Sequence, residues 1–421
     1  MHIFKPKSEF TRNVLTLMTG TTIAQAIPIA ISPILTRIYT PEDFGIFALY
    51  ISIASILSLI ATGRYELAIM LPTKDKDAVN IVALSLFISF FVSFIALLIV
   101  SIFNTQITSL LGNPDISSWL YFIPLTVLFT GIYQSFNYWS NRKKEYKRLA
   151  TSKVIQSTTT ATTNLSMGFA GFGSSGLVLA SVLGQGVVAS FLAQRVYKEG
   201  LYRLKDIETI KILVMLKKYK KLPLFNLPNA LIDGIRVSGI SILIAKNFTT
   251  ASLGQFSLAW KIVQTPTALI GSSLSQVFFQ KIATAKRADL YLIVTKFLLK
   301  STLISLPIFL FIYICAEDIF AIVFGQEWRL AGEIASLLSP WIFFNFLTAP
   351  MGNLFIVLNR QEIVLVVSLF YMLVPLMILL TLHQFGFIYV LGLISFAMSI
   401  ILLLYIGLVL IYTHKEQSNG L

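Results

Sequence analysis

The sequence predicts an all-α polytopic membrane protein with about twelve spanning helices in two six-helix bundles. It also predicts that both ends of the chain lie in the cytoplasm. Of the 421 residues, 56% are hydrophobic and only 12% are charged, which is about half the charged share of a soluble domain. So few charged side chains cannot cover the surface of a globule. Apolar stretches of about 20 residues, enough to cross a bilayer, follow one another almost end to end.

Twelve such stretches divide the chain. The first is too long for a signal-peptide core, so we expect it to be retained as a span. The fifth contains a run of Ser, Thr and Asn at 157–164, and small hydroxylated residues suit a helix packed inside a bundle. The predicted spans are 14–38, 44–71, 78–103, 119–140, 151–171, 174–196, 222–248, 252–279, 290–314, 331–358, 362–382 and 387–412.

Basic residues alternate from loop to loop. The net charge is +14, and 26 of the 33 Lys and Arg residues lie in the N-terminus, the even-numbered loops and the C-terminal tail. The odd-numbered loops hold three, namely Arg37, Lys246 and Arg329. Because basic residues stay on the cytoplasmic side, this alternation predicts cytoplasmic ends and an even number of spans. The same clustering argues against a nucleic-acid partner.

The longest polar stretch lies at the middle of the chain and divides it into three predicted regions. Residues 1–200 form the first bundle, 201–221 a linker and 222–421 the second bundle. Between its basic residues the linker carries Ile207, Ile210, Leu213, Val214 and Leu216. This pattern favours an amphipathic helix on the anionic inner leaflet, although a plain charged linker remains an alternative.

The two halves resemble each other in sequence. A shift of 209 residues lays Arg37 on Lys246 and Thr40 on Thr249, together with Gly45 on Gly254, Phe47 on Phe256 and Leu49 on Leu258. Later, 111–112 resembles 324–325, and 141–142 matches 359–360. An even number of spans in each copy predicts two repeats of the same orientation, as in parallel-repeat transporters.

No catalytic constellation is present, so we expect neither an enzyme nor a cofactor. The three histidines, His2, His383 and His414, lie at the chain ends or at a helix end, and no HExxH, GxSxG or phosphate-binding glycine loop occurs. The single Cys315 excludes an intrachain disulfide and a cysteine-rich metal site. The external loops are short, which argues against a polysaccharide polymerase.

Among the charged residues inside predicted spans, five are candidates for a function: Arg64, Glu66, Asp233, Arg236 and Lys261. A charge near the bilayer centre costs ~2.5–3.5 kcal/mol, so each needs a reason. In a helix, Arg64 and Glu66 would point to different faces, whereas Asp233 and Arg236 would share one and could neutralise each other. Snorkelling to the interface is the alternative for Arg64 and Lys261, and a structural ion pair for Asp233 and Arg236.

We hypothesise a water-filled cavity between the two halves that receives an anionic headgroup. Arg64, Arg236 and Lys261 would line it, since their charge and multiple donors suit a diphosphate. Glu66 or Asp233 could bind a coupling ion.

The helices that open each half are predicted to be bent by proline. The prolines are Pro28, Pro33, Pro223 and Pro228. Bends at matching places are plausible hinges for alternating access. Gln25, Asn226 and Asn229 could line the same cavity, although hydrogen bonding between helices is an equal alternative.

Several runs of the sequence are similar to a known family. They are 33–45 (PILTRIYTPEDFG), 64–72 (RYELAIMLP), 254–259 (GQFSLA) followed by Pro266, and 275–279 (SQVFF). These runs resemble bacterial O-antigen and capsule repeat-unit flippases of the multidrug/oligosaccharidyl-lipid/polysaccharide exporter superfamily. The resemblance extends over essentially the whole chain.

The resemblance implies two six-helix bundles that form a V in the bacterial cytoplasmic (inner) membrane. It implies that an oligosaccharide on undecaprenyl diphosphate moves from the cytoplasmic to the periplasmic leaflet, for O-antigen, capsule or exopolysaccharide synthesis, with H⁺ or Na⁺ coupling. Membrane lipids, a polysaccharide polymerase and a chain-length regulator are the implied partners. The first span carries no charge before Arg37, unlike peptidoglycan-precursor flippases of the superfamily, which argues against that substrate. A multidrug/cation antiporter and a membrane polysaccharide polymerase remain the alternatives.

Overall fold

The computed structural model describes residues 9–198, 207–358 and 360–419, and within these ranges every regular element is helical. Contacts between Cα atoms group the chain into two compact units, Met1–Lys246 and Asn247–Leu421. The predicted all-α fold is confirmed.

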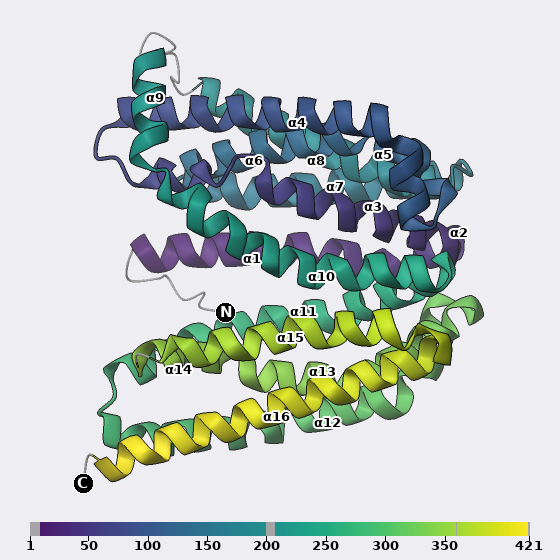
Figure 1. Cartoon of the computed structure of the whole chain (residues 1–421), viewed down its shortest axis with the longest axis vertical. Coiled ribbons are helices and arrows are strands. Elements are labelled where there is room, and N and C mark those ends of the chain that lie inside the picture. Colours follow the sequence, from purple (N-terminus) through teal and green to yellow (C-terminus); the bar gives the residue numbers. More distant parts are fainter. Residues whose placement is uncertain (1–8, 199–206, 359, 420–421) are drawn as a thin grey trace, which may run out of the picture. The chain divides into compact units, whose positions relative to one another are not determined.

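The first unit contains ten α-helices, counted over the described residues (Figure 1). They are α1 (Glu9–Ala30), α2 (Ser32–Ile38), α3 (Pro41–Ile60), α4 (Asp75–Leu111), α5 (Ser117–Leu120), α6 (Ile123–Arg142), α7 (Tyr146–Phe169), α8 (Ser174–Lys198), α9 (Thr209–Lys218) and α10 (Leu227–Asn247). Three shorter turns join them: the 3-10 helices η1 (Tyr65–Met70) and η2 (Pro114–Ile116), and the π-helix η4 (Leu222–Asn226).

The second unit is made of six further α-helices within the described residues. They are α11 (Thr250–Thr284), α12 (Leu290–Phe324), α13 (Arg329–Thr348), α14 (Gly352–Val357), α15 (Gln361–Thr381) and α16 (Phe387–Asn419). The 3-10 turns between them are η5 (Arg287–Asp289), η6 (Gln326–Trp328), η7 (Ala349–Met351) and η8 (His383–Phe385).

Among the described residues, nine helices are long and apolar enough to cross a membrane. A tenth results if the pair Pro114–Leu120 and Ile123–Arg142, bent by 47°, is one span. The two remaining predicted spans correspond to α7 and α11, which have 24 and 35 residues. At 1.5 Å per residue both could cross roughly 30 Å of hydrocarbon, but their polar residues keep them outside the apolar set. That these two helices cross the membrane, and that both chain ends are cytoplasmic, stay predictions.

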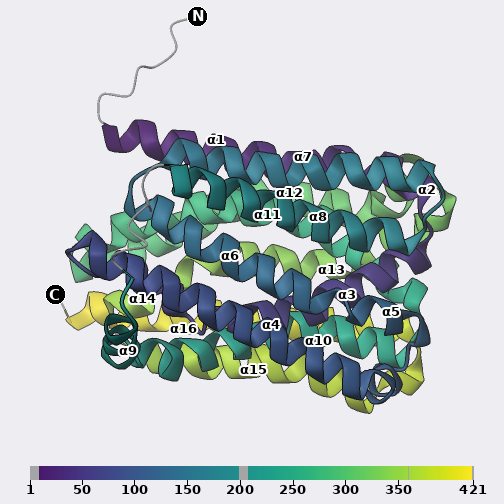
Figure 2. The ribbon, with the colours of Figure 1, turned by 90° about the horizontal axis from the view of Figure 1, so that it is seen from above.

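In the first unit, α7 packs between α1 and α8, and α6 packs against α4 and α8. Figure 2 shows α1 and α7 running side by side along one edge of this unit. Close approach between these helices depends on small residues, as expected for helices that associate inside a bilayer. A Cβ atom at Gly20 of α1 would lie 2.4 Å from the Cβ of Ala150 on α7.

In the second unit, α13 is the central helix and packs against α11, α12 and α16. The buried Gln255 ties α11 to the start of α13. Its amide nitrogen donates to the Glu327 carbonyl at 2.6 Å, and its amide oxygen accepts from the Ala331 N–H at 2.9 Å. Gln255 belongs to the run 254–259 that resembled a known family, and this pair of bonds gives it a structural role.

Residues aligned between the two halves have the same local roles. Thr40 and Thr249 are the N-cap residues of α3 and α11, where each hydroxyl accepts a backbone N–H, at 3.2 and 3.0 Å. Gly112 and Gly325 end the long helices α4 and α12 with positive φ angles of 68° and 109°, which glycine adopts without strain. These matches support the repeat read from the sequence.

The expected proline interruptions are present. A break at Ile31, between Pro28 and Pro33, separates α1 from α2. In the other half, Pro223 lies in the π-helix η4 and Pro228 at the start of α10. The prediction that these helices are irregular is therefore confirmed, whereas their use as hinges stays a prediction.

The described part of the linker forms the helix α9, which runs across one end of α4 in Figure 1. Met215 is buried in a core cluster with residues of η1, α4, α6 and α8. On the opposite face, Ile210, Leu213 and Val214 are at least half exposed. The helix is amphipathic as predicted, and residues 201–206 of the linker lie outside the described residues.

The helix α10 groups with the first unit, up to Lys246. The sequence repeat assigns the same helix to the second copy, which begins at 222. A Cβ atom at Gly234 would lie 2.3 Å from Leu59 Cδ1, so α10 lies close against α3. The predicted division follows the sequence repeat and stays a prediction, with boundaries at 1–200, 201–221 and 222–421.

Candidate functional site

The first candidate residues, Arg64 and Glu66, lie on a turn. The sequence predicts a second span over 44–71, but α3 ends at Ile60 and the 3-10 helix η1 begins at Tyr65. Gly63 and Arg64 both have positive φ angles, 57° and 63°. The expectation that Arg64 and Glu66 point to different helical faces is therefore wrong, because the chain is not α-helical there.

Instead, Arg64 and Glu66 form an ion pair, with 3.5 Å between Nη1 and Oε1. The Glu66 side chain is 1% exposed, and its other oxygen accepts a hydrogen bond from the Thr62 hydroxyl. Arg64 is 25% exposed, and its buried Nε has no hydrogen-bond partner among the described residues. The guanidinium thus has a donor without a protein acceptor, while Glu66 balances its charge.

The turn is held in place from two sides. The Tyr65 hydroxyl donates to the Leu216 carbonyl of α9 at 3.0 Å. From α6, Arg142 donates to the Ile69 carbonyl at 3.2 Å and to Asp75 Oδ1 at 3.1 Å. These contacts explain why the run 64–72 has a fixed shape: it is the junction of η1 with α4, α6 and α9.

Arg236 is half-buried on α10, in the same unit as Arg64. The side chain of Asp233 lies outside the described residues, so the expected ion pair between Asp233 and Arg236 stays a prediction. Lys261 is half-buried on α11 in the second unit, and it makes no hydrogen bond or ion pair with a described residue. The predicted convergence of Arg64, Arg236 and Lys261 on one cavity also stays a prediction.

The polar residues near the prolines differ in environment. Gln25 is half-buried on α1, and its buried Oε1 has no hydrogen-bond partner among the described residues. Asn226 and Asn229 are exposed at the start of the helix pair η4 and α10. The alternative role for these three residues was hydrogen bonding between helices. Among the described residues, their side chains form no such bond.

Sequence reasoning missed a polar cluster in the first unit. Lys153, counted with the loop before the fifth span, lies in the second turn of α7, where its Nζ donates to Thr21 Oγ1 of α1 at 3.0 Å. Gln156 of α7 donates to Gln185 of α8 at 2.5 Å. The hydroxyl-rich composition of 151–171 was the signal for a packed helix, but the meeting of these side chains depends on how α1, α7 and α8 pack.

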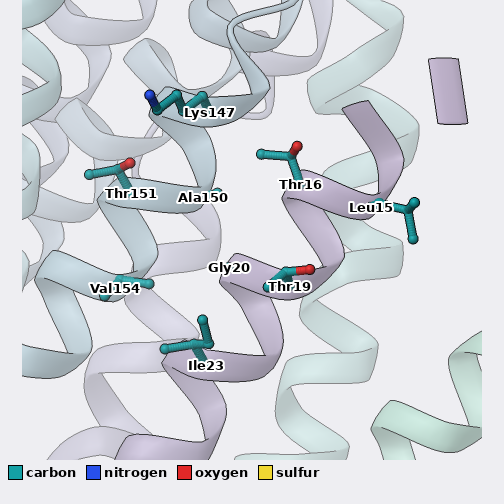
Figure 3. A pocket seen from close by; sticks show the side chains of 9 residues that line it. All are labelled: Leu15, Thr16, Thr19, Gly20, Ile23, Lys147, Ala150, Thr151 and Val154. Atoms are coloured by element: carbon teal, nitrogen blue, oxygen red, sulfur yellow. The ribbon is translucent and has the colours of Figure 1, made fainter. Parts of the chain in front are cut away.

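A groove of about 570 Å³ lies on the other flank of the contact between α1 and α7 (Figure 3). Gly20 and Ala150 face each other along it. Apart from Lys147 and three threonines, its lining is apolar. The lining residues are Leu15, Thr16, Thr19, Gly20, Ile23, Lys147, Ala150, Thr151 and Val154.

No set of three or more His, Cys, Asp or Glu side chains that could hold a metal ion occurs among the described residues. The cationic and polar side chains above are therefore the chemistry on which a function must be built.

The profile of a protein family described as "Polysaccharide biosynthesis protein" matches residues 34–332. The chain belongs to this family. The match includes the runs that carry the sequence resemblance, namely 33–45 (from residue 34), 64–72, 254–259 and 275–279. No curated protein sequence matches the chain significantly.

Solved structures of transporters share the fold of this polysaccharide biosynthesis protein. An inward-facing multidrug resistance MATE family transporter of the MOP superfamily superposes with a TM-score of 0.71 at 14% identity, over 96% of this chain and 95% of its own. The lipid II flippase MurJ, in an inward closed conformation, superposes with a TM-score of 0.69 at 11% identity, over 94% and 86%. A MOP superfamily transporter from Pyrococcus furiosus gives 0.59 at 15% identity, over 96% and 95%. The chain therefore has the fold of these transporters, as the sequence resemblance implied.

Proposed function

We propose that this protein is a flippase that moves oligosaccharide repeat units linked to undecaprenyl diphosphate from the cytoplasmic to the periplasmic leaflet of a bacterial inner membrane. The observation that supports this most is a transporter fold, in a polysaccharide biosynthesis protein, in which Arg64 has an unbonded Nε and Lys261 makes no hydrogen bond or ion pair with a described residue. A polysaccharide repeat unit assembled on a lipid must cross the membrane, and its diphosphate needs cationic partners there.

Arg64, Arg236 and Lys261 are the residues proposed to contact the diphosphate during transport. The argument is simplest for Lys261. It is a half-buried ammonium without a partner among the described residues, and such a charge raises the free energy of the protein inside a membrane. A diphosphate would supply the missing countercharge. Arg64 already has Glu66, so an anion at Arg64 would compete with that carboxylate.

This competition suggests how an ion could be coupled to transport. When a phosphate takes the place of Glu66 at Arg64, the 1% exposed carboxylate loses its countercharge. A buried carboxylate without a countercharge takes up a proton or a sodium ion. Glu66 is thus the first candidate for ion coupling, with Asp233 as the second. Gln25, Asn226 and Asn229 are proposed as polar contacts of the sugar.

Deletion of the gene in its native host tests the proposal. We expect lipid-linked repeat units to accumulate in the inner leaflet, and complementation with the intact gene to clear them. If deletion stops assembly of the repeat unit itself, or leaves its distribution between the leaflets unchanged, the protein does not transport it.

The similarity to the MATE transporter favours a second candidate function, export of drugs or cations. Such a protein needs acidic groups open to its ligand, whereas Glu66 is bonded to Arg64 and Thr62. Expression in a drug-sensitive strain separates the two functions. A flippase leaves the minimal inhibitory concentrations of cationic drugs unchanged, and an exporter raises them.

A further inference from the structure

The half-buried Lys153 has no acidic partner among the described residues. Its ammonium donates to the Thr21 hydroxyl oxygen, and that hydroxyl donates to the Leu17 carbonyl at 2.8 Å. The partner is therefore neutral, and two of the three ammonium donors are left over. An ammonium at such a place in a spanning bundle usually marks a path or a site for an anion.

Other polar groups lie on the same flank of α1 and α7. Gln25 follows Thr21 by one helical turn, and its buried Oε1 has no partner among the described residues. Gln156 follows Lys153 by one turn and bonds Gln185 through one end of each amide. The other ends of these two amides make no hydrogen bond with a described residue.

The contact between α1 and α7 separates this polar flank from the groove of Figure 3. Gly20 meets Ala150 too closely for a side chain to fit between them, and the Ser157 hydroxyl donates to the Ala24 carbonyl at 2.6 Å. Lys147 lines the apolar groove, whereas Lys153 and Thr21 do not. Lys147 and Lys153 of one helix thus have different surroundings, the first an apolar groove and the second a set of polar side chains.

We infer that Gln25, Lys153, Gln156 and Gln185 form a binding site for the phosphate and the adjoining sugar of a lipid-linked saccharide, while Thr21 holds the Lys153 ammonium in place. The compact ammonium suits a phosphate oxygen. The amides offer the paired donors and acceptors that sugar hydroxyls need. The inference rests on the proposed function and assigns to it a site other than Arg64, Arg236 and Lys261.

Binding of undecaprenyl diphosphate to the full chain in zwitterionic nanodiscs tests the site. The variant Lys153→Met removes the charge and keeps an apolar stem. Lys147→Met makes the same change on the groove flank and is the matched control. We expect Lys153→Met to weaken binding at least tenfold, Lys147→Met to change it less than twofold, and Lys153→Arg to retain most of it. Equal affinities for Lys153→Met and the wild type would overturn the inference.

Thr21→Val separates binding from a structural role. It removes the hydroxyl that accepts from Lys153 but leaves the ammonium for a ligand. If Lys153 only joins α1 to α7, Thr21→Val will reproduce both the loss of binding and the fall in melting temperature of Lys153→Met. We expect instead that Thr21→Val keeps binding within about threefold of the wild type.

Two further measurements identify the ligand. The first compares binding of phosphatidylglycerol and of undecaprenyl diphosphate in nanodiscs that contain phosphatidylglycerol. If Lys153→Met weakens binding of phosphatidylglycerol but not of undecaprenyl diphosphate, the site binds a bilayer lipid and the inference is overturned. A wild-type protein that binds no undecaprenyl diphosphate contradicts the proposed function as well. If the wild type and Lys153→Met bind and transport the lipid equally well, only this inference is contradicted and the proposed function stands.

Discussion

At the scale of single residues, the candidate site is a set of cations that differ in whether an acidic side chain neutralises them. Arg64 is neutralised by Glu66, while Lys261 and Lys153 have no acidic partner among the described residues. The sequence identifies Arg64 and Lys261, because a charge inside an apolar stretch is visible there. It does not show the pairing of Arg64 with Glu66, since that depends on the positive φ angle of Arg64. Gly63 was the available signal for the turn.

The Arg64–Glu66 pair makes a prediction about stability. Arg64→Gln leaves the buried Glu66 with only the Thr62 hydroxyl, and we expect a loss of about 1–3 kcal/mol in the free energy of unfolding. The double variant Arg64→Gln with Glu66→Gln should regain most of that loss, because no unpaired charge is left. Equilibrium unfolding in mixed micelles measures both. Additive effects in this double-mutant cycle would mean that the pair does not form.

At the scale of helices, apolar stretches locate most elements and fail where a helix is polar or a span is interrupted. The predicted spans 78–103 and 387–412 lie within α4 and α16. By contrast, α7 was located correctly although it is too polar to qualify by apolar character alone. The bend before α6 was not predicted, because residues 119–123 remain apolar through it. The end of α3 at Ile60 was not predicted either, although Gly63 and two charged residues follow it.

The N-caps of α3 and α11 can be compared directly. Thr40 has a reciprocal bond, since Asp43 Oδ2 accepts the Thr40 N–H at 3.0 Å, whereas Thr249 is followed by Ser252 at the matching position. Thr40→Ala should cost about 1 kcal/mol of the free energy of unfolding. Thr249→Ala, as the paired variant, should cost no more than that, because no carboxylate completes its cap. A larger cost at Thr249 than at Thr40 in the same unfolding assay would contradict the stabilising role assigned to Asp43.

At the scale of the whole molecule, the family and fold agree with the resemblance read from short runs of sequence. The matching N-caps at Thr40 and Thr249 were also predictable from the sequence, whereas the division into two six-helix copies stays a prediction. The contacts of Lys153 with α1 were not predictable. They arise from packing between helices more than a hundred residues apart in the chain.

The positive-inside pattern predicts the orientation, and single cysteines can check it. In a Cys315→Ser background, Gln384→Cys lies in a predicted external loop and Ser418→Cys in the predicted cytoplasmic tail. A membrane-impermeant maleimide should label Gln384→Cys in intact spheroplasts, and Ser418→Cys only after permeabilisation. The opposite pattern of labelling would reverse the predicted topology.

The central claim is that Arg64, Arg236 and Lys261 bind the diphosphate of a lipid-linked sugar as it crosses the bilayer. Its most direct measurement is the rate at which purified protein in vesicles moves an undecaprenyl-diphosphate-linked oligosaccharide between leaflets. The wild type should accelerate this movement, and replacing Arg64, Arg236 and Lys261 together by Gln should reduce it at least tenfold while the protein remains folded. Unchanged transport by the folded triple variant would contradict the account.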